Sequence, residues 1–95
     1  MGKLTGQYWV YVLWSEKAQR RYIGVSEDVV KRVEQHNAGV SRWTRGRGPW
    51  VLEWSKEFPD YRSARQFENL LKQQKGGTGF FVLTGVEQPG SSLGS

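Results

Sequence analysis

Hydrophobic residues fill the chain from Tyr8 to Trp14, a pattern typical of a central strand that is covered on both faces. A short polar connection at residues 15–19 separates this run from a second β-prone run at residues 21–25. So short a connection favours an antiparallel hairpin. The pattern therefore predicts a pair of neighbouring strands near the N-terminus.

The expected register of this hairpin places two phenols side by side. With the turn centred between residues 16 and 17, Tyr11 lies opposite Tyr22, and Trp9 lies opposite Gly24. Directly opposed side chains share a face and lie about 4.5–5.5 Å apart at Cβ. Gly24 is then expected to leave a gap where another backbone or a ligand can approach. The two tyrosines are either core aromatics or phenols placed to meet polar partners further along the chain.

The residues after the hairpin predict a helix. Ser26 is the expected N-cap, and the two acids after it would complement the helix dipole in the first turn. Val29, Val30 and Val33 form a hydrophobic stripe. Gly39 is suited to a left-handed cap at the C-terminal end.

A loop and a half-buried strand come next. Residues 39–49 are rich in glycine and arginine and predict a loop. From residue 50 onward, hydrophobic and polar residues alternate, which predicts a strand with one buried face. The residues expected on that face are Trp50, Leu52, Trp54 and Phe58.

A second helix is predicted after this strand. Asp60 or Ser63 can cap it, and Ser63 with Gln66 fits a capping box. Gly76-Gly77 is expected to end the helix. Its predicted core stripe consists of Ala64, Phe67, Leu70 and Leu71.

The order of the elements predicts the fold class. Residues 78–83 fit either a short third helix or an edge strand, and residues 86–95 have the composition of a disordered tail. One domain is therefore expected over residues 1–85. The order β-β-α-β-α predicts an α+β fold in which a small sheet is flanked by helices.

Composition narrows the classes of function. The 95 residues suffice for one small domain, and 14 Lys and Arg against 9 Asp and Glu give a net charge of +5, which favours polyanions as partners. The absence of cysteine excludes disulfides and thiolate zinc sites, and a single histidine, His36, excludes a multi-histidine metal cage. No hydrophobic stretch approaches the roughly 20 residues of a membrane span, and no signal-peptide pattern is present. A cytoplasmic protein without membrane association is expected.

Candidate chemistry begins on the predicted first helix. Arg32 and His36 are four residues apart, so they lie on one side of that helix. The helix follows directly from the strand that carries Tyr22, and this strand end therefore opens onto the same region. A solvated helix face with one spare histidine is the alternative interpretation.

A carboxylate on the second helix also has two interpretations. Glu68 lies beside the hydrophobic stripe, and Lys72 follows four residues later. The two side chains can form an ordinary surface ion pair. Alternatively, Glu68 can hold Mg²⁺, which keeps several waters and takes its remaining ligands from substrate phosphates.

The loop is a candidate nucleic-acid contact. Arginine forks suit phosphate oxygens, and an exposed aromatic ring can stack on a base. The loop combines both, although a flexible basic loop is the simpler alternative. Trp50 is expected in the core at the start of the strand. The candidate contact residues are Arg42, Trp43, Arg45 and Arg47.

Taken together, these residues resemble the signature of the GIY-YIG nuclease superfamily. The second tripeptide, Tyr22-Ile23-Gly24, is intact, whereas the first, Trp9-Val10-Tyr11, keeps only the tyrosine. Arg32, His36 and Glu68 follow in the matching order. The chain is most similar to small stand-alone members related to the nuclease domain of the bacterial excinuclease. Its GRGPW loop also resembles the catalytic subunit of eukaryotic junction endonucleases.

The resemblance implies a three-stranded antiparallel sheet between helices and hydrolysis of DNA phosphodiesters with one Mg²⁺ or Mn²⁺ ion. Glu68 would hold the metal. Tyr11 would act as the general base or position the attacking water, and Tyr22 would bind the phosphate or orient Tyr11. Arg32 would neutralise charge on the phosphate, and His36 would relay a proton or hydrogen-bond Tyr11.

The resemblance also suggests partners and alternatives. Lys72 is a further candidate for phosphate contact. Family members often carry a separate DNA-binding domain, so a protein partner that supplies additional DNA-binding surface is expected. Two other hypotheses remain open: a non-catalytic nucleic-acid-binding module with the same fold, and a small structural adaptor whose partner supplies the DNA.

Overall fold

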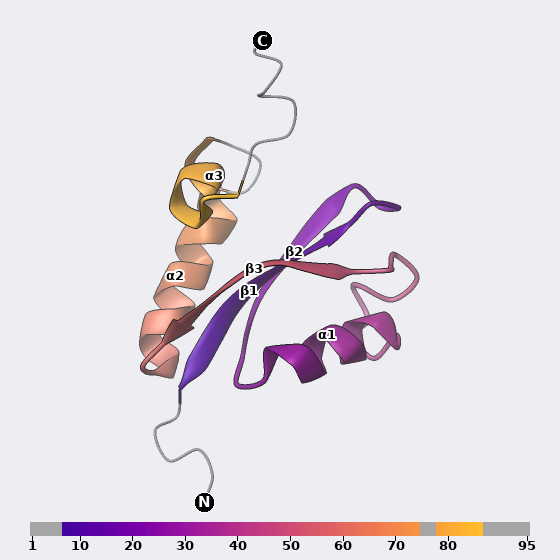
Figure 1. The fold of residues 1–95 in the computed structure, drawn as a ribbon, viewed down its shortest axis with the longest axis horizontal. Coiled ribbons are helices and arrows are strands. Elements are labelled where there is room, and N and C mark those ends of the chain that lie inside the picture. Colours follow the sequence, from indigo (N-terminus) through magenta and orange to yellow (C-terminus); the bar gives the residue numbers. More distant parts are fainter. Residues whose placement is uncertain (1–6, 75–77, 87–95) are drawn as a thin grey trace, which may run out of the picture.

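The structure, a computed structural model, describes residues 7–74 and 78–86. A three-stranded antiparallel sheet has the strand order β2-β1-β3, with α2 and α3 on one face and α1 on the other (Figure 1). The predicted α+β fold is therefore confirmed. The elements in chain order are β1 (Tyr8–Ser15), β2 (Arg20–Ser26), α1 (Val29–Asn37), β3 (Val51–Phe58), α2 (Tyr61–Gln74) and α3 (Thr78–Thr84).

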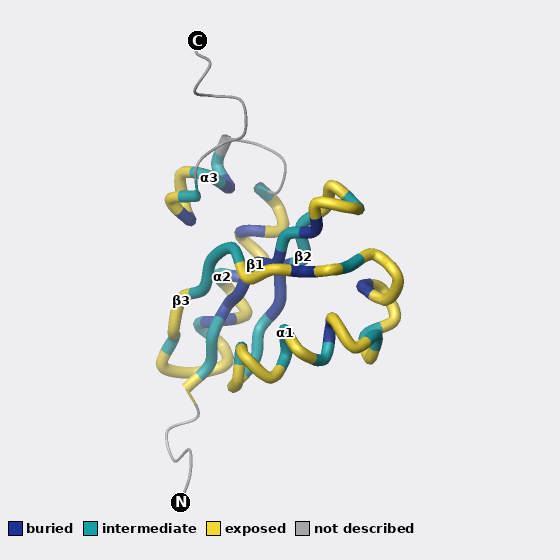
Figure 2. The backbone as a smooth tube through the Cα atoms, turned by 45° about the vertical axis from the view of Figure 1, so that its right-hand side comes forward, coloured by how far each residue is buried: buried dark blue, intermediate teal, exposed yellow. Residues whose placement is uncertain are grey.

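The central strand β1 separates two hydrophobic cores, as its unbroken hydrophobic run predicts. The burial pattern in Figure 2 follows this strand through the middle of the molecule. The α2 core lies between the sheet and α2 with α3, and the smaller α1 core lies on the opposite face. The α2 core contains Val10, Val12, Ile23, Ala64, Leu71 and Phe80, and the α1 core contains Tyr11, Leu13 and Trp50 with Tyr22, Val29 and Val33 packed against them.

The register of the hairpin differs from the predicted one by two residues. Tyr11 pairs with Gly24, and Tyr22 pairs with Leu13. The turn is displaced because Ser15 remains paired in the strand while its side chain accepts a hydrogen bond from the Ala18 N–H at 3.1 Å. A shift of two residues keeps every side chain on its predicted face, so the two tyrosines are diagonal neighbours instead of directly opposed ones.

Gly24 consequently serves a different purpose from the one predicted. Trp9 lies opposite Ser26, and the gap above Gly24 is filled by the ring of Tyr11. A Cβ atom at position 24 would lie 2.6 Å from the Tyr11 hydroxyl oxygen, far inside van der Waals contact. The missing side chain therefore lets the phenol extend across β2.

Helix α1 begins two residues later than Ser26 predicts. Asp28 is the N-cap, and its carboxylate accepts a hydrogen bond from the Lys31 N–H at 3.0 Å. Ser26 instead accepts from the Asp28 N–H, which closes a local turn before the helix, so both acids precede the first helical turn. Val30, predicted in the stripe, is 70% exposed. The left-handed cap is confirmed by a φ of +84° at Gly39.

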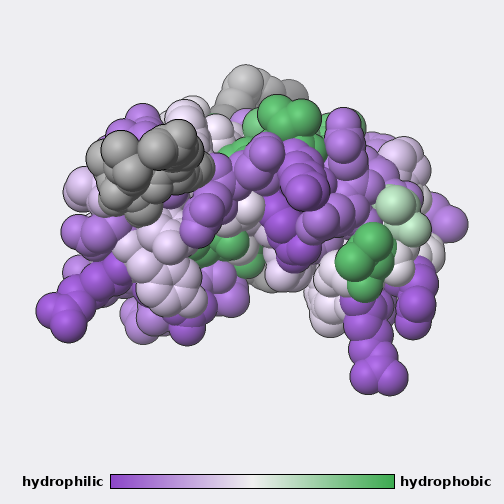
Figure 3. Space-filling model, turned by 90° about the horizontal axis from the view of Figure 1, so that it is seen from below, coloured by the Kyte–Doolittle hydropathy of each residue, from purple (hydrophilic) through white to green (hydrophobic). Residues whose placement is uncertain are grey.

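The molecule seen from below, in Figure 3, presents a mainly hydrophilic surface. Hydrophobic side chains on this face form small, separate patches. Within the described residues, no helix has the length and hydrophobicity needed to cross a membrane.

A β-bulge in β3 overturns the predicted alternation. The pairing of β1 with β3 shifts between Val12 and Leu13, so Leu52 pairs with Leu13 and Trp54 pairs with Val12. Because adjacent residues of β1 point to opposite faces, Leu52 and Trp54 do not share one face. Trp54 packs on the α2 core, whereas Leu52 is largely exposed.

Helix α2 is capped by Asp60, whose carboxylate accepts from the Ser63 N–H at 2.7 Å, so the alternative capping box that begins at Ser63 is wrong. Ala64 and Leu71 are buried as predicted, but Leu70 is exposed. Residues 78–84 form the short helix α3, not an edge strand. The predicted stop at Gly76-Gly77 and all but the first residue of the predicted tail at 86–95 lie outside the described residues.

Candidate active site

Tyr11 and His36 form a buried pair beneath the C-terminal half of α1. The Tyr11 hydroxyl lies 3.1 Å from His36 Nε2, and both side chains are about 1% exposed. Arg32, one turn earlier on α1, places its guanidinium 3.5 Å from the same ring nitrogen. The predicted grouping of Tyr11, Arg32 and His36 is thus present in the structure.

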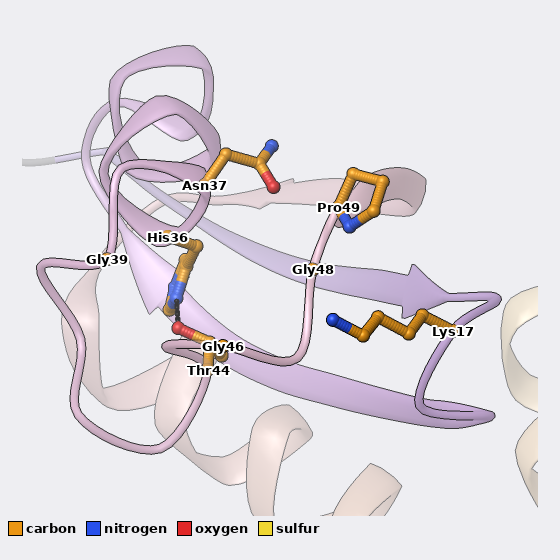
Figure 4. Close-up of a pocket in the computed structure, with 8 residues that line it drawn as sticks. All are labelled: Lys17, His36, Asn37, Gly39, Thr44, Gly46, Gly48 and Pro49. Atoms are coloured by element: carbon orange, nitrogen blue, oxygen red, sulfur yellow. Dashed lines mark hydrogen bonds between the residues drawn. The ribbon is translucent and has the colours of Figure 1, made fainter.

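The hydrogen bonds around His36 determine which ring nitrogen carries the proton. Nδ1 lies 2.8 Å from the Thr44 hydroxyl, drawn in Figure 4, and that hydroxyl donates to the Ser41 carbonyl at 3.4 Å. Thr44 therefore accepts from Nδ1–H. The N–H groups of Arg32 also require an acceptor at Nε2. Both constraints leave Nε2 unprotonated, so the Tyr11 hydroxyl donates to it.

Burial keeps this pair uncharged. Desolvation, reinforced by the positive charge of Arg32, lowers the pKa of His36 to about 4. Desolvation also raises the pKa of Tyr11, and this effect outweighs the hydrogen bond and the charge of Arg32, which act in the opposite direction. In the free protein, Tyr11 is therefore a neutral phenol and His36 a neutral imidazole at pH 7.

Tyr22 extends the cluster toward the protein surface. Its ring centroid lies 4.6 Å from that of His36 and 6.2 Å from that of Tyr11. On its other side, the Tyr22 ring contacts Trp43 at a centroid distance of 5.7 Å. Trp43 in turn lies 5.9 Å from the buried Trp50. A continuous row of aromatic rings thus connects the buried histidine to the loop.

Glu68 lies on α2, which covers the opposite face of the sheet. Its carboxylate is about 5% exposed and contacts two cations, Arg65 Nη1 at 2.6 Å and Lys72 Nζ at 3.2 Å. The predicted Glu68–Lys72 ion pair is present, but Glu68 is buried, unlike a member of an ordinary surface pair. Its two cationic partners compensate a charge that would otherwise be costly to bury.

The two halves of the site meet at the edge of β2. Tyr22 belongs to the face covered by α1 and Ile23 to the face covered by α2, yet both line one cavity of about 330 Å³ together with Trp43 and Lys72. The negative charge of Glu68 contributes to raising the pKa of Tyr11, as expected for a carboxylate close to the phenol. The five residues predicted to carry catalysis therefore surround one strand edge.

The donor set around Glu68 limits the kind of metal site possible. Among the described residues, no group of three or more histidine, cysteine, aspartate or glutamate side chains could hold a metal ion. A single carboxylate fits Mg²⁺ or Mn²⁺ only where water and substrate phosphate supply the remaining ligands. Glu68 fits that description, because its carboxylate is close to the cavity into which a phosphate could enter.

The candidate nucleic-acid contacts in the loop differ in their surroundings. Arg42 and Arg45 are exposed. Arg47 helps to hold the loop: its Nε donates to the Trp43 carbonyl at 2.7 Å, and its guanidinium lies 5.1 Å from the centroid of the Trp43 ring. Trp50 is buried, as predicted.

Three residues that sequence reasoning missed hold the site together. Thr44 orients His36, and Ser15 donates to the Arg47 carbonyl at 2.5 Å, which ties the hairpin to the loop. Asn37 exchanges two hydrogen bonds with the backbone of Trp50, at 2.7 and 2.9 Å. These small polar residues lie in a turn, a loop and a helix end, where such residues are common, so the pattern alone does not single them out.

Comparison with known proteins gives consistent results. The GIY-YIG catalytic domain family matches residues 7–79. A UPF0213 protein of Vibrio parahaemolyticus is 34% identical over 74 residues, which cover 77% of this chain and 70% of that protein. The human structure-specific endonuclease subunit SLX1 is 36% identical over 72 residues, which cover 70% of this chain but 26% of SLX1.

A solution NMR structure of a UPF0213 protein from Bacillus halodurans is 31% identical, with a TM-score of 0.46 over 74% of each chain. The family match spans most of the chain, including every residue of the cluster around Tyr11 and His36 and the carboxylate on α2. The chain belongs to the GIY-YIG catalytic domain family.

Proposed function

We propose that this chain is a divalent-metal-dependent endonuclease that hydrolyses phosphodiester bonds in DNA. The observation that carries the proposal is the buried Tyr11–His36 pair beside Arg32, which opens at the edge of β2 toward the carboxylate of Glu68. The family match supports it, as does the similarity to a protein named as a structure-specific endonuclease subunit.

The Tyr11–His36 pair can move a proton without first becoming charged. As Tyr11 accepts a proton from the attacking water, its own hydroxyl proton passes to His36 Nε2, because that proton already lies in the 3.1 Å hydrogen bond. Thr44 accepts from Nδ1–H and keeps the ring oriented throughout. Both atoms that exchange protons are thus in place before the substrate binds, and water alone becomes the nucleophile.

Two cations on opposite sides of β2 suit the scissile phosphate. Arg32 contacts the Tyr11–His36 pair, and Lys72 lies at the cavity. Guanidinium and ammonium groups placed where negative charge develops lower the barrier of such a reaction. Glu68 would hold the metal ion, which when bound supplies a Lewis acid for the phosphate and stabilises the leaving oxygen.

The proposal is tested by incubating the purified chain with labelled duplex, flap and junction DNA in Mg²⁺ or Mn²⁺. Glu68→Gln removes the metal-binding charge at nearly constant volume, and Glu57→Gln, an exposed residue on β3, is the matched control. We expect cleavage by wild type and Glu57→Gln, and a loss of about 10²-fold or more in Glu68→Gln, the scale of losing one electrostatic catalytic contact.

Two outcomes would contradict the proposal. Equal cleavage by Glu68→Gln and wild type would assign the activity to a contaminant. Salt-sensitive DNA binding without cleavage under any metal condition would favour the binding module instead.

A further inference from the structure

The cavity at the edge of β2 has walls suited to a flat aromatic ligand. Tyr22 and Trp43 form two of its sides, with ring centroids 5.7 Å apart and planes inclined by 35°. Ile23 adds a hydrophobic surface and Lys72 adds a positive charge. Aromatic and aliphatic walls with one cation are the chemistry that holds a nucleobase together with its adjoining phosphate.

The cavity adjoins both halves of the candidate active site. Tyr22 connects it to His36, at a centroid distance of 4.6 Å. Lys72 connects it to Glu68, at 3.2 Å. Any group that fills the cavity therefore lies next to the phosphate on which these residues would act.

Trp43 is held in a fixed position although 42% of its surface is exposed. Its backbone carbonyl accepts from Arg47 Nε, and its ring packs against Trp50. Trp50 is itself anchored, because its indole N–H donates to the Thr44 carbonyl at 3.0 Å. An exposed aromatic ring with a rigid support is preorganised for stacking, since little conformational entropy is lost when a base packs against it.

We propose that this cavity receives an unpaired nucleobase of the DNA substrate, next to the scissile phosphate. This inference rests on the proposed endonuclease function and specifies its substrate class. In continuous duplex DNA each base is covered by its stacked neighbours, so bringing one against Trp43 requires unstacking and unpairing. A base in a flap, bulge or frayed junction is free of that cost, and the cavity therefore selects DNA with unpaired nucleotides.

The selectivity can be measured without cleavage. Dissociation constants are determined by fluorescence anisotropy, at one fixed salt concentration and without divalent metal, for a continuous duplex and for the same duplex with an unpaired flap. Trp43→Leu removes the stacking surface. The matched control, Trp9→Leu, removes a partly exposed tryptophan at the far end of β1, outside the site.

In Trp43→Leu we expect the preference for flap over duplex to fall by about 5- to 150-fold, the range for the loss of one stacked base. Duplex affinity should change by less than about twofold, since the phosphate contacts remain. Trp9→Leu should retain the wild-type preference. An unchanged preference in Trp43→Leu, or an equal loss of affinity for both DNAs, would overturn the proposal.

A second measurement keeps the proposal testable if Trp43→Leu fails to fold. 5-Iodouracil is placed at successive unpaired positions of the flap, the wild-type complex is irradiated, and the crosslinked peptide is identified by mass spectrometry. We expect crosslinks to Trp43 or Tyr22 from the unpaired nucleotide nearest the branch. Crosslinks confined to other residues would contradict the inference.

Failure of this inference differs from failure of the proposed function. Cleavage that is lost in Glu68→Gln, combined with equal binding of flap and duplex, would leave the endonuclease intact and remove the base site. A flap preference that depends on Trp43, without cleavage under any metal condition, would do the reverse.

Discussion

His36 has both ring nitrogens hydrogen-bonded inside the protein, and this determines how the fold responds to acid. Its pKa is lowered to about 4 in the folded state, from an ordinary value near 6.5. As the pH falls below about 6.5, the unfolded chain takes up a proton that the folded chain refuses, so acid favours unfolding. The stabilisation is complete above about pH 6.5 and is lost as the pH falls toward 4.

The predicted consequence is a fall in the free energy of unfolding of at most about 3 kcal/mol from this residue between pH 6.5 and pH 4. Urea denaturation at a series of pH values measures it. In His36→Gln, which carries no titratable ring, this part of the pH dependence should vanish, although the variant is less stable at pH 7. Identical pH profiles for the two proteins would show that His36 titrates normally.

Strand β2 contributes to the site through a residue without a side chain. The Tyr11 ring crosses Gly24, where a methyl group would lie 2.6 Å from the hydroxyl oxygen and 2.7 Å from the ring carbon that bears it. Because Tyr11 is about 1% exposed and packed on all sides, it cannot move aside without disturbing the α1 core. Gly24→Ala should therefore destabilise the fold by about 1–3 kcal/mol and reduce cleavage by displacing the phenol.

A double-mutant cycle with Tyr11→Ala separates this clash from other effects of the substitution. If the ring is the cause, Gly24→Ala should cost much less stability in the Tyr11→Ala background than in wild type. Thermal denaturation of the four proteins provides the values. Equal costs in both backgrounds would indicate that the alanine acts through the backbone of β2 alone.

At the scale of elements, the pattern of hydrophobic residues predicts both strands of the hairpin, β3 and both long helices. It also places Tyr11 and Tyr22 on one face, because that depends only on the period of two residues. The register and the start of α1 are missed for one reason. Ser15 and Asp28 accept backbone hydrogen bonds through their side chains, and several neighbouring polar residues could do the same.

The bulge in β3 and the role of Thr44 are missed for a different reason. The bulge depends on which residues of β1 lie opposite, and the Thr44–His36 hydrogen bond joins a loop to a helix eight residues earlier. Both are tertiary contacts that local pattern does not encode. Burial of Glu68 is missed likewise, since its spacing to Lys72 is that of an ordinary surface ion pair.

For the whole molecule, the net charge of +5 predicts DNA binding that weakens as salt is added. Arg42 is exposed on the loop beside the aromatic row, so Arg42→Ala should reduce the slope of log affinity against log salt by about 0.9 for duplex DNA. The melting temperature should stay the same. Arg47→Ala should lower the melting temperature as well, because Arg47 holds the loop.

Arg62→Ala is the control, since Arg62 is exposed in the first turn of α2 and its replacement removes the same charge from the molecule. Titrations at several salt concentrations should leave its slope near the wild-type value. An equal reduction by Arg62→Ala and Arg42→Ala would mean that total charge, not the loop, determines affinity.

The position of the site at the edge of the sheet has one more consequence. Within the described ranges, β2 pairs with β1 alone, so its outer backbone groups form an open edge. Open strand edges are templates on which another chain can add a strand, the first step of many aggregation processes. DNA held against Tyr22 and Trp43 would cover that edge. Substrate binding and self-association of the chain would then compete for one surface, and bound DNA would keep the protein dispersed.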